Sequence, residues 1–411
     1  MAGRQPAIPF IVVTVIIDMM GIGLLLPVIP SLVGEFTHDV QEQTYWYGAM
    51  VFTFGFTQFL CAPMLGALSD RYGRRLVLLL SIGGLGTMFL LSGLVRSLPM
   101  LLGTRIIGGL FASNMSVANA YVADITKPED RAKSFGLVGA AFGVGFVLGP
   151  VTGGLLGSIA IRLPFFVAAG LALLNFAYGA LVLPESLPPE RRKPIDLRKA
   201  NPFGALVGLV RLKGVGLLVT VIALTNLSQF ILNSIWVIYN EYRFGWGPRE
   251  AGLSLFVVGL MFALVQGVLL GRLLRHLGEQ RVVLLGLASG TCAYLMYGCA
   301  TKGWMMYAIS IANFLAFAVS AAINALVSKA ADAREQGLAM GSLSSLNSLL
   351  TVIAPALSTP LFAHVSRYPT GDFRVGAPFF LGATFTATAL AIAAFHFTRV
   401  KSAPPRPAAA P

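Results

Sequence analysis

Long apolar runs constrain this chain more than any other feature of its sequence. Twelve stretches of about 20 residues carry few charged side chains, and this is the length that an α-helix needs to cross a bilayer. They are too long for barrel strands, which need only about 10 residues each. A helix can span lipid because it satisfies its own backbone hydrogen bonds. The predicted spans are 8–32, 44–68, 76–95, 99–124, 133–158, 162–184, 213–240, 250–273, 281–300, 303–328, 337–363 and 376–397.

The composition agrees with a membrane protein. Of 411 residues, 56% are hydrophobic and 11% are charged, whereas a soluble domain carries about 25% charged residues. Cys61, Cys292 and Cys299 fall in apolar runs, where we expect small core residues, and their spacing fits neither a metal site nor a disulfide framework. No HExxH, GxSxG or P-loop pattern occurs. We therefore expect no enzyme, no metal site and no bound cofactor.

The positive charges predict the orientation. If the N-terminus is cytoplasmic, 22 of the 30 Lys and Arg residues lie on the inner side, seven lie on the outer side, and Arg105 lies within a span. This distribution favours cytoplasmic N- and C-termini and an even number of spans. It also explains the net charge of +13 by topology, so we expect no nucleic acid partner. No small-residue cleavage site follows the first apolar run, which we interpret as an uncleaved span.

A charged loop motif occurs twice, about 205 residues apart. Gly66–Arg75 follows the second span, and a less perfect copy, Gly271–Arg281, follows the eighth. The loop after the fourth span, at 124–136, likewise resembles the loop after the tenth, at 332–337. Parallel repeats predict an all-α integral membrane transporter: twelve transmembrane helices in two pseudo-symmetric six-helix bundles. The predicted parts are a first bundle at 1–184, a cytoplasmic linker at 185–212, a second bundle at 213–400 and a disordered tail at 401–411.

Two charged residues lie at membrane depth. Asp18 is about ten residues into the first span, or roughly 15 Å deep, where a carboxylate costs about 2.5–3.5 kcal/mol. We interpret it as a proton-coupling group, with a structural hydrogen bond to a polar neighbour such as Gln58 as the alternative. Arg105 opens the predicted fourth span from the outer side. It either extends toward the outer surface or reaches the central cavity and tunes a buried acid, and we favour the second.

The fifth span holds a proline among glycines. Gly145, Gly149, Pro150, Gly153 and Gly154 predict a kink with close approach of a neighbouring helix. Tight packing alone is one interpretation, and a pivot between two conformations is the other.

Charged residues at the cytoplasmic ends of spans two to five predict a gate. Asp70 would stabilise a helix N-terminus of the other half, and Arg74 would pair with Asp124. Each would otherwise be an ordinary solvated loop charge. The full predicted gate comprises Gly66, Asp70, Arg71, Gly73, Arg74, Asp124 and Arg131.

Polar residues recur on span seven at steps of three and four, so they share one helical face. This stripe predicts the wall of a water-filled cavity, although hydrogen bonds between helices would give the same pattern. The predicted cavity residues are Asn226, Gln229, Asn233, Trp236 and Asn240, with Gln58, Gln266 and Asn347 as further candidates.

These motifs resemble the major facilitator superfamily, and within it the tetracycline/proton efflux group and related multidrug antiporters. The resemblance also includes Asp18–Gly23, Glu241–Trp246 and Glu335–Gly337. It implies export of a drug-like compound against inward proton flow, with Asp18 and Arg105 in the transport cavity. True tetracycline exporters carry an acid in span nine and a histidine in span eight, where this chain has Gly290 and Phe262. Tetracycline itself is therefore not predicted.

The sequence thus predicts a proton-coupled antiporter for drug-like, lipophilic small molecules that works by alternating access. Its expected partners are the substrate, protons and the lipid bilayer, and the expected setting is a monomer in the bacterial inner membrane. The alternative is a major facilitator carrier for a metabolite such as a sugar, peptide or siderophore, with import as one of its two possible directions. A receptor that does not transport would need an added soluble domain, and no loop is long enough for one.

Overall fold

The computed structural model describes residues 8–112, 114–127, 130–192, 194, 216–330 and 336–402. Over these residues the chain forms helices and no strand. Eleven helices are long and apolar enough to cross a membrane, and a bent pair of helices makes a twelfth span. The predicted all-α fold with twelve spans is confirmed. Most of the predicted linker and nearly all of the predicted tail lie outside the described residues.

The first six spans pack on one another. The fourth of them is divided between two helices, and a short helix, α2 (Ile29–Gly34), follows the first. The spans are α1 (Ile8–Leu25), α3 (Val40–Tyr72), α4 (Arg74–Leu94), α5 (Leu98–Phe111) with α6 (Asn114–Ile125), α7 (Arg131–Ile159) and α8 (Leu163–Val182). The turn η2 (Pro189–Arg191) follows them.

The last six spans form the second group, and two of them are irregular. The eighth span contains a π-helical turn, η3 (Val265–Leu269). The tenth is bent by 50° at Asn313, where α14 ends and the 3₁₀ turn η4 (Phe314–Ala318) begins. The helices are α10 (Gly216–Phe244), α11 (Pro248–Leu264) with α12 (Leu270–Leu277), α13 (Glu279–Cys299), α14 (Gly303–Ala312) with α15 (Val319–Ala330), α16 (Gln336–Val365) and α17 (Ala377–Ser402). A short turn, η5 (Phe373–Gly376), leads into α17.

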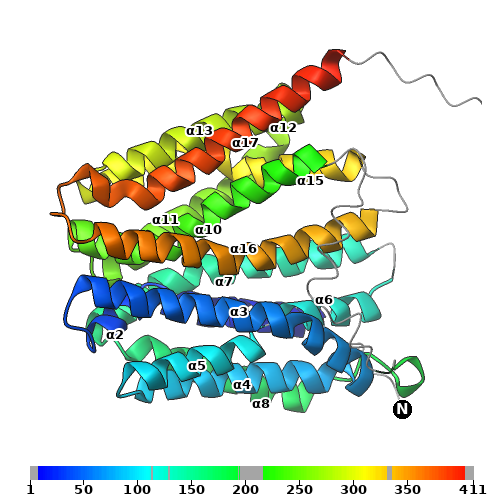
Figure 1. Cartoon of the computed structure of the whole chain (residues 1–411). Coiled ribbons are helices and arrows are strands. Elements are labelled where there is room, and N and C mark those ends of the chain that lie inside the picture. Colours follow the sequence, from blue (N-terminus) through cyan, green and yellow to red (C-terminus); the bar gives the residue numbers. More distant parts are fainter. Residues whose placement is uncertain are drawn as a thin grey trace, which may run out of the picture.

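Two helix pairs make most of the contacts between the groups, α3 with α16 and α7 with α11, and α3 also meets α10. Figure 1 shows the first group in blue to teal below the second group in green to red, with α3 lying beside α16 at the boundary. We call these groups the N-terminal half and the C-terminal half. The outer surface is apolar: Leu181 is 81% exposed and Leu174 is 69% exposed. In water such a surface would be costly, whereas lipid solvates it.

The halves meet at one end of the bundle, which we call the Glu241 end. There Ser31 and Gln43 donate hydrogen bonds to the Glu241 carboxylate at 3.3 and 3.1 Å. Tyr47 of α3 belongs to the same buried cluster as Tyr239 and Phe362 of the C-terminal half. We call the opposite end, where α3 reaches Asp70, the Arg74 end.

The helices are open toward the Arg74 end. An added Cβ at Gly139 or Gly143 of α7 would meet no atom within 4 Å. The same is true at Gly267 in η3 and at Gly271 in α12. The buried clusters nearer this end each stay within one half. Over the described residues, the two halves are therefore in contact at the Glu241 end and apart at the Arg74 end.

Candidate functional site

The repeated loop motif has the same backbone form in both halves. Gly73 separates α3 from α4 with φ +103°, and Gly278, 205 positions later, separates α12 from α13 with φ +75°. Both glycines combine positive φ with an extended ψ, a region that other residues rarely occupy. The sharp turn directs α4 and α13 back across the bundle.

Arg74 is the centre of the first loop. Its side chain forms an ion pair with Asp70, donates from Nε to Asp124 at 3.2 Å, and donates from Nη1 to Ser69 at 2.6 Å. The predicted pairing of Arg74 with Asp124 is present. Since Asp70 and Asp124 are partly exposed, each pair contributes only about 0–1 kcal/mol to stability.

Asp70 differs from the expectation. The sequence predicted that it would stabilise a helix N-terminus of the other half, but within the described chain its partner is Arg74 of its own half. The physical reason is the opening at this end, because a contact across the halves needs them to approach. Among the other predicted gate residues, Arg131 donates to the Ala123 carbonyl at 3.3 Å, and Arg71 lies over the Tyr72 ring. An added Cβ at Gly66 would meet nothing within 4 Å.

Glu185 is a loop residue that the sequence analysis missed. Its carboxylate accepts hydrogen bonds from the backbone N–H groups of Arg74, Ser186 and Leu187 at 2.9–3.0 Å. The first of these bonds satisfies an otherwise unpaired donor at the N-terminus of α4 and places negative charge there. The segment after the sixth span is therefore docked on the motif, at least as far as Leu187. The available signal was an acid directly after Pro184, where the apolar run stops.

Asp18 lies in α1, which packs against α7, α8 and α6. Its side chain is buried, with 5% exposed. The membrane depth predicted from the sequence thus coincides with burial inside the N-terminal half. Gln58 of α3, the predicted neighbour, donates to the Ala112 carbonyl at 3.1 Å.

Arg105 is buried between α5 and α4. Its Nη2 donates to the Ser92 hydroxyl at 2.8 Å, and Ser92 in turn bonds Thr104 at 2.8 Å. Ser92 lies two residues before the end of α4, on the side away from the Arg74 loop. The guanidinium therefore bonds toward the Glu241 end.

The glycines of α7 face two partners. An added Cβ at Gly145 would lie 2.5 Å from the Ile16 carbonyl, and one at Gly149 would lie 2.8 Å from Gly23 Cα, both on α1. Gly153 continues this face against Leu24. The predicted close approach of a neighbouring helix is thus present, and the neighbour is α1.

The other partner of α7 belongs to the C-terminal half. An added Cβ at Gly154 would lie 2.5 Å from the Pro248 carbonyl and 2.9 Å from Gly252 Cα, both on α11. A Cβ at Gly252 would in turn meet the Pro150 carbonyl. Gly252 was not predicted; a glycine near the start of an apolar span was its only signal. α7 therefore links the Asp18 helix to the opposite half through backbone contact.

Only part of the predicted polar stripe of α10 lines a cavity. Asn226 donates to Asn347 of α16 at 2.7 Å, Gln229 donates to Asn233 at 3.1 Å, and Trp236 donates to Ser254 at 2.9 Å. Asn240 is fully buried and donates to the Trp236 carbonyl of its own helix. Asn226, Gln229 and Trp236 line a cavity, and Asn233 and Asn240 are not among its lining residues.

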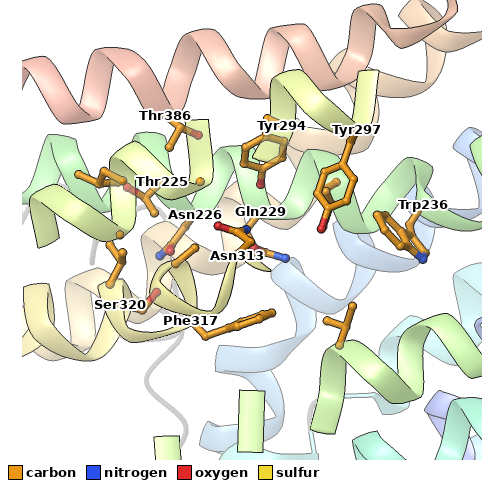
Figure 2. Close-up of a pocket in the computed structure, with 17 residues that line it drawn as sticks. Thr225, Asn226, Gln229, Trp236, Tyr294, Tyr297, Asn313, Phe317, Ser320 and Thr386 are labelled. Carbon is orange, nitrogen blue, oxygen red and sulfur yellow. The ribbon is translucent and has the colours of Figure 1, made fainter. Parts of the chain in front are cut away.

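This cavity lies wholly in the C-terminal half (Figure 2). α10, α11, α13, α17 and the bent tenth span all contribute to its wall. The sequence analysis missed its α13 residues and those of the bent tenth span, although Tyr294 and Tyr297 are spaced for one helical face. The labelled lining residues are Thr225, Asn226, Gln229, Trp236, Tyr294, Tyr297, Asn313, Phe317, Ser320 and Thr386.

The bent tenth span forms one side of the cavity and is held by two side chains. Gln266 in the π-helical turn donates to the Phe317 carbonyl at 2.8 Å. Ser289 of α13 donates to the Asn313 side-chain oxygen at 2.9 Å. Irregular backbone at membrane depth is tolerated where it is buried in protein or lines a cavity. Gln266, predicted to be a cavity residue, therefore supports the cavity wall from behind.

Twelve spans in two joined halves, with an acid and a polar cavity at membrane depth, define a membrane transporter. The sequence model of the Major Facilitator Superfamily matches residues 11–355. Tetracycline resistance protein, class C, of Escherichia coli is 39% identical over 350 residues, which cover 85% of this chain and 88% of that protein. Multidrug resistance protein 2 of Bacillus subtilis is 28% identical over 360 residues, which cover 86% and 88%.

The solved structure of the human organic anion transporter MFSD10 (TETRAN) is similar as well, with a TM-score of 0.68 at 25% identity, over 94% of this chain and 98% of that chain. The chain belongs to the major facilitator superfamily. Its predicted resemblance to the tetracycline-efflux-like members is confirmed. It is a multi-pass membrane transporter and not an enzyme.

Proposed function

We propose that the protein is a proton-coupled antiporter that exports drug-like, lipophilic small molecules by alternating access. The observation that carries the proposal is the position of Asp18. This buried carboxyl lies on the helix that packs against the glycine face of α7, and α7 touches the other half through Gly154 and Gly252. A change of charge on α1 therefore acts on a helix that contacts both halves.

Protonation of Asp18 supplies the driving step. A carboxylate in a low-dielectric interior is costly, whereas the neutral acid is tolerated. Binding and release of a proton thus change the free energy of the packing around α1. The halves then separate at one end and close at the other, with α7 and α11 in contact at the pivot. The proton gradient is the energy source, and no bound cofactor is needed.

The proposed setting is the bacterial inner membrane, with the Arg74 end in the cytoplasm. The positive charges support this orientation, since 22 of the 30 Lys and Arg residues lie on that side of the predicted spans. Both termini are then cytoplasmic, and the conformation described above is open to the cytoplasm, where an exporter loads its substrate. We propose a monomer, because each half finds its partner within the same chain.

The names of the relatives support a drug-like substrate, since they include tetracycline and multidrug resistance proteins. The composition of the cavity supports a lipophilic one. Trp236, Tyr294, Tyr297 and Phe317 line it together with neutral amides. Tetracycline remains one candidate among such compounds.

The test is proton-driven transport in everted membrane vesicles. Asp18→Asn should abolish substrate uptake driven by an imposed proton gradient, while the protein is expressed at the level of the wild type. Asp130→Asn is the matched control, because Asp130 is exposed and makes no side-chain cap to α7. Gradient-driven uptake by Asp18→Asn at the wild-type rate would contradict the assignment of Asp18.

A further inference from the structure

The cavity of the C-terminal half carries no charge. None of the described residues that line it is Asp, Glu, Lys, Arg or His. An ion entering this interior would lose its hydration and find no opposite charge. Aromatic rings and neutral hydrogen-bonding groups make up much of the wall, and the rings of Trp236 and Tyr297 meet edge to face at 5.2 Å. The cavity therefore favours an uncharged aromatic group.

Tyr294 supplies an unused polar group inside this cavity. Its side chain is 93% buried, yet its hydroxyl has no hydrogen-bond partner among the described residues. Figure 2 shows the hydroxyl pointing toward Gln229 on the opposite wall. The neighbouring Tyr297 hydroxyl differs, because it bonds Ser310 at 2.9 Å. The Tyr294 hydroxyl borders the cavity, so a ligand that accepts or donates a hydrogen bond there finds a partner that no described side chain already uses.

Gly290 leaves space beside Tyr294, one helical turn away on α13. An added Cβ at Gly290 would lie 3.5 Å from Thr386 and 3.8 Å from Ala316, which are ordinary contact distances. Gly286, another lining glycine, differs because a Cβ there would collide with Val319. Gly286 is thus needed for helix packing, whereas Gly290 keeps part of the cavity empty.

We propose that this cavity is a substrate subsite for an uncharged aromatic ring with a hydrogen-bonding substituent, such as an aryl amide or a phenol, with Tyr294 as its polar anchor. The subsite rests on the proposed function, since it names the substrate group that the transporter recognises. The cavity volume of about 80 Å³ is far below the roughly 300–1,000 Å³ that encloses a drug-sized molecule. It accommodates one part of a substrate, and the remainder lies outside it.

The proposed subsite and the proposed proton-coupling residue lie in different halves of the protein. All of its lining residues belong to the C-terminal half, whereas Asp18 belongs to the N-terminal half. Substrate and proton therefore do not share a binding group, and coupling between them passes through the contacts between halves.

The experiment measures binding of three probes of one shape to the purified full chain by equilibrium dialysis. The probes are 2-naphthamide, which is uncharged, 2-naphthoate, an anion, and 2-naphthylmethylammonium, a cation. The amide should bind at least about tenfold more tightly than either ion, because the ions lose hydration without compensation. Tyr294→Phe should weaken amide binding by roughly 2- to 10-fold, the loss of one hydrogen bond.

Two valine variants test whether the space beside Gly290 is needed for binding. Gly290→Val should abolish amide binding by filling the cavity, whereas Gly271→Val, in open space on α12, should leave it unchanged. Equal affinity for the three probes, or wild-type binding by Gly290→Val, would overturn the subsite even if proton-driven export is intact. If the subsite results hold but vesicles show no proton-driven uptake, the proposed function fails and the binding site stands.

Discussion

The loop at Gly66–Arg75 depends on the backbone of one residue, Gly73. With φ +103° and ψ 151°, Gly73 ends α3 and begins α4 within a single residue. An added Cβ would meet the Glu185 carboxylate, which bonds the first N–H of α4. The same position therefore needs glycine for two independent reasons: its dihedral angles and the close approach of an acid.

Gly278, the equivalent glycine of the second half, has the unusual dihedral angles of Gly73 but no acid beside it, so the two reasons can be tested apart. Gly278→Ala suffers only backbone strain, because a Cβ there meets nothing within 4 Å, and such strain costs roughly 1–3 kcal/mol. Gly73→Ala adds a clash with Glu185, so it should lower the thermal unfolding midpoint further. The measurement is thermal unfolding of both purified variants beside the wild type. Equal decreases would show that the Glu185 contact contributes nothing.

For single residues, the sequence predicts which side chains are charged and able to pair better than it predicts which residue each one contacts. The pairing of Arg74 with Asp124 follows from charge and from the order of the spans. The partner of Asp70 does not, because it depends on whether the halves are together at that end. Glu185 was missed for a different reason: a capping carboxylate from a distant segment has no local pattern around it.

α7 packs against its neighbours through glycines that leave no room for a side chain. Its glycines at steps of four bring the backbone of α1 within the reach of a Cβ, and Gly154 brings in the backbone of α11. The spacing of small residues predicted close contact, but it could not predict which of the other helices would be the partner. That choice depends on the arrangement of all the spans.

Two glycines of α7 provide a matched comparison. Gly149→Ala places a Cβ 2.8 Å from Gly23 Cα and from the Met20 carbonyl, where overpacking costs roughly 1–3 kcal/mol. Gly143→Ala meets nothing within 4 Å, and alanine in a helix interior gains roughly 0.5–1 kcal/mol over glycine. The midpoint temperature of thermal unfolding should therefore fall for Gly149→Ala, and it should stay the same or rise for Gly143→Ala. The packing argument is wrong if both variants shift in the same direction.

The π-helical and 3₁₀ turns of spans eight and ten could not be predicted from apolar runs. Spans eight and ten are both apolar enough to cross a membrane, so the sequence predicts two more regular helices. Their π-helical and 3₁₀ turns arise in the folded bundle, where Gln266 satisfies the Phe317 carbonyl and Ser289 holds Asn313. A hydropathy pattern measures how well a segment suits lipid, and it contains no information about such cross-helix bonds.

Across the whole molecule, the number of spans and the pairing of repeated loops follow from sequence, while the conformation does not. Both end states of a transporter bury the same apolar runs and repeat the same motifs. Their difference in free energy comes from a few contacts between the halves, which here lie at the Glu241 end. Ser31 and Gln43 of one half both bond the Glu241 carboxylate of the other, and Gln41 accepts from Arg367 nearby.

These contacts predict a shift in conformation when Glu241 is changed. Glu241→Ala removes the acceptor of both cross-half bonds, and a hydrogen bond to a charged group is worth roughly 1.5–3 kcal/mol. The halves should then separate at this end in a much larger fraction of molecules. Spin labels at His38 and Thr370, both exposed, report that separation in a chain with its three cysteines replaced. Electron–electron distance measurements should show a longer population in the variant.

Glu250→Ala is the control for this shift, because Glu250 lies on α11 of the C-terminal half and caps its own helix through the Gly247 N–H at 3.0 Å. Among the described residues the Glu250 carboxylate bonds only within its own half, so the distance distribution of Glu250→Ala should match that of the wild type. Glu241→Gln keeps one acceptor oxygen and should fall between the wild type and Glu241→Ala. If Glu241→Ala leaves the distances unchanged, the closed end is held by the apolar cluster around Tyr47, and the polar contacts only follow it.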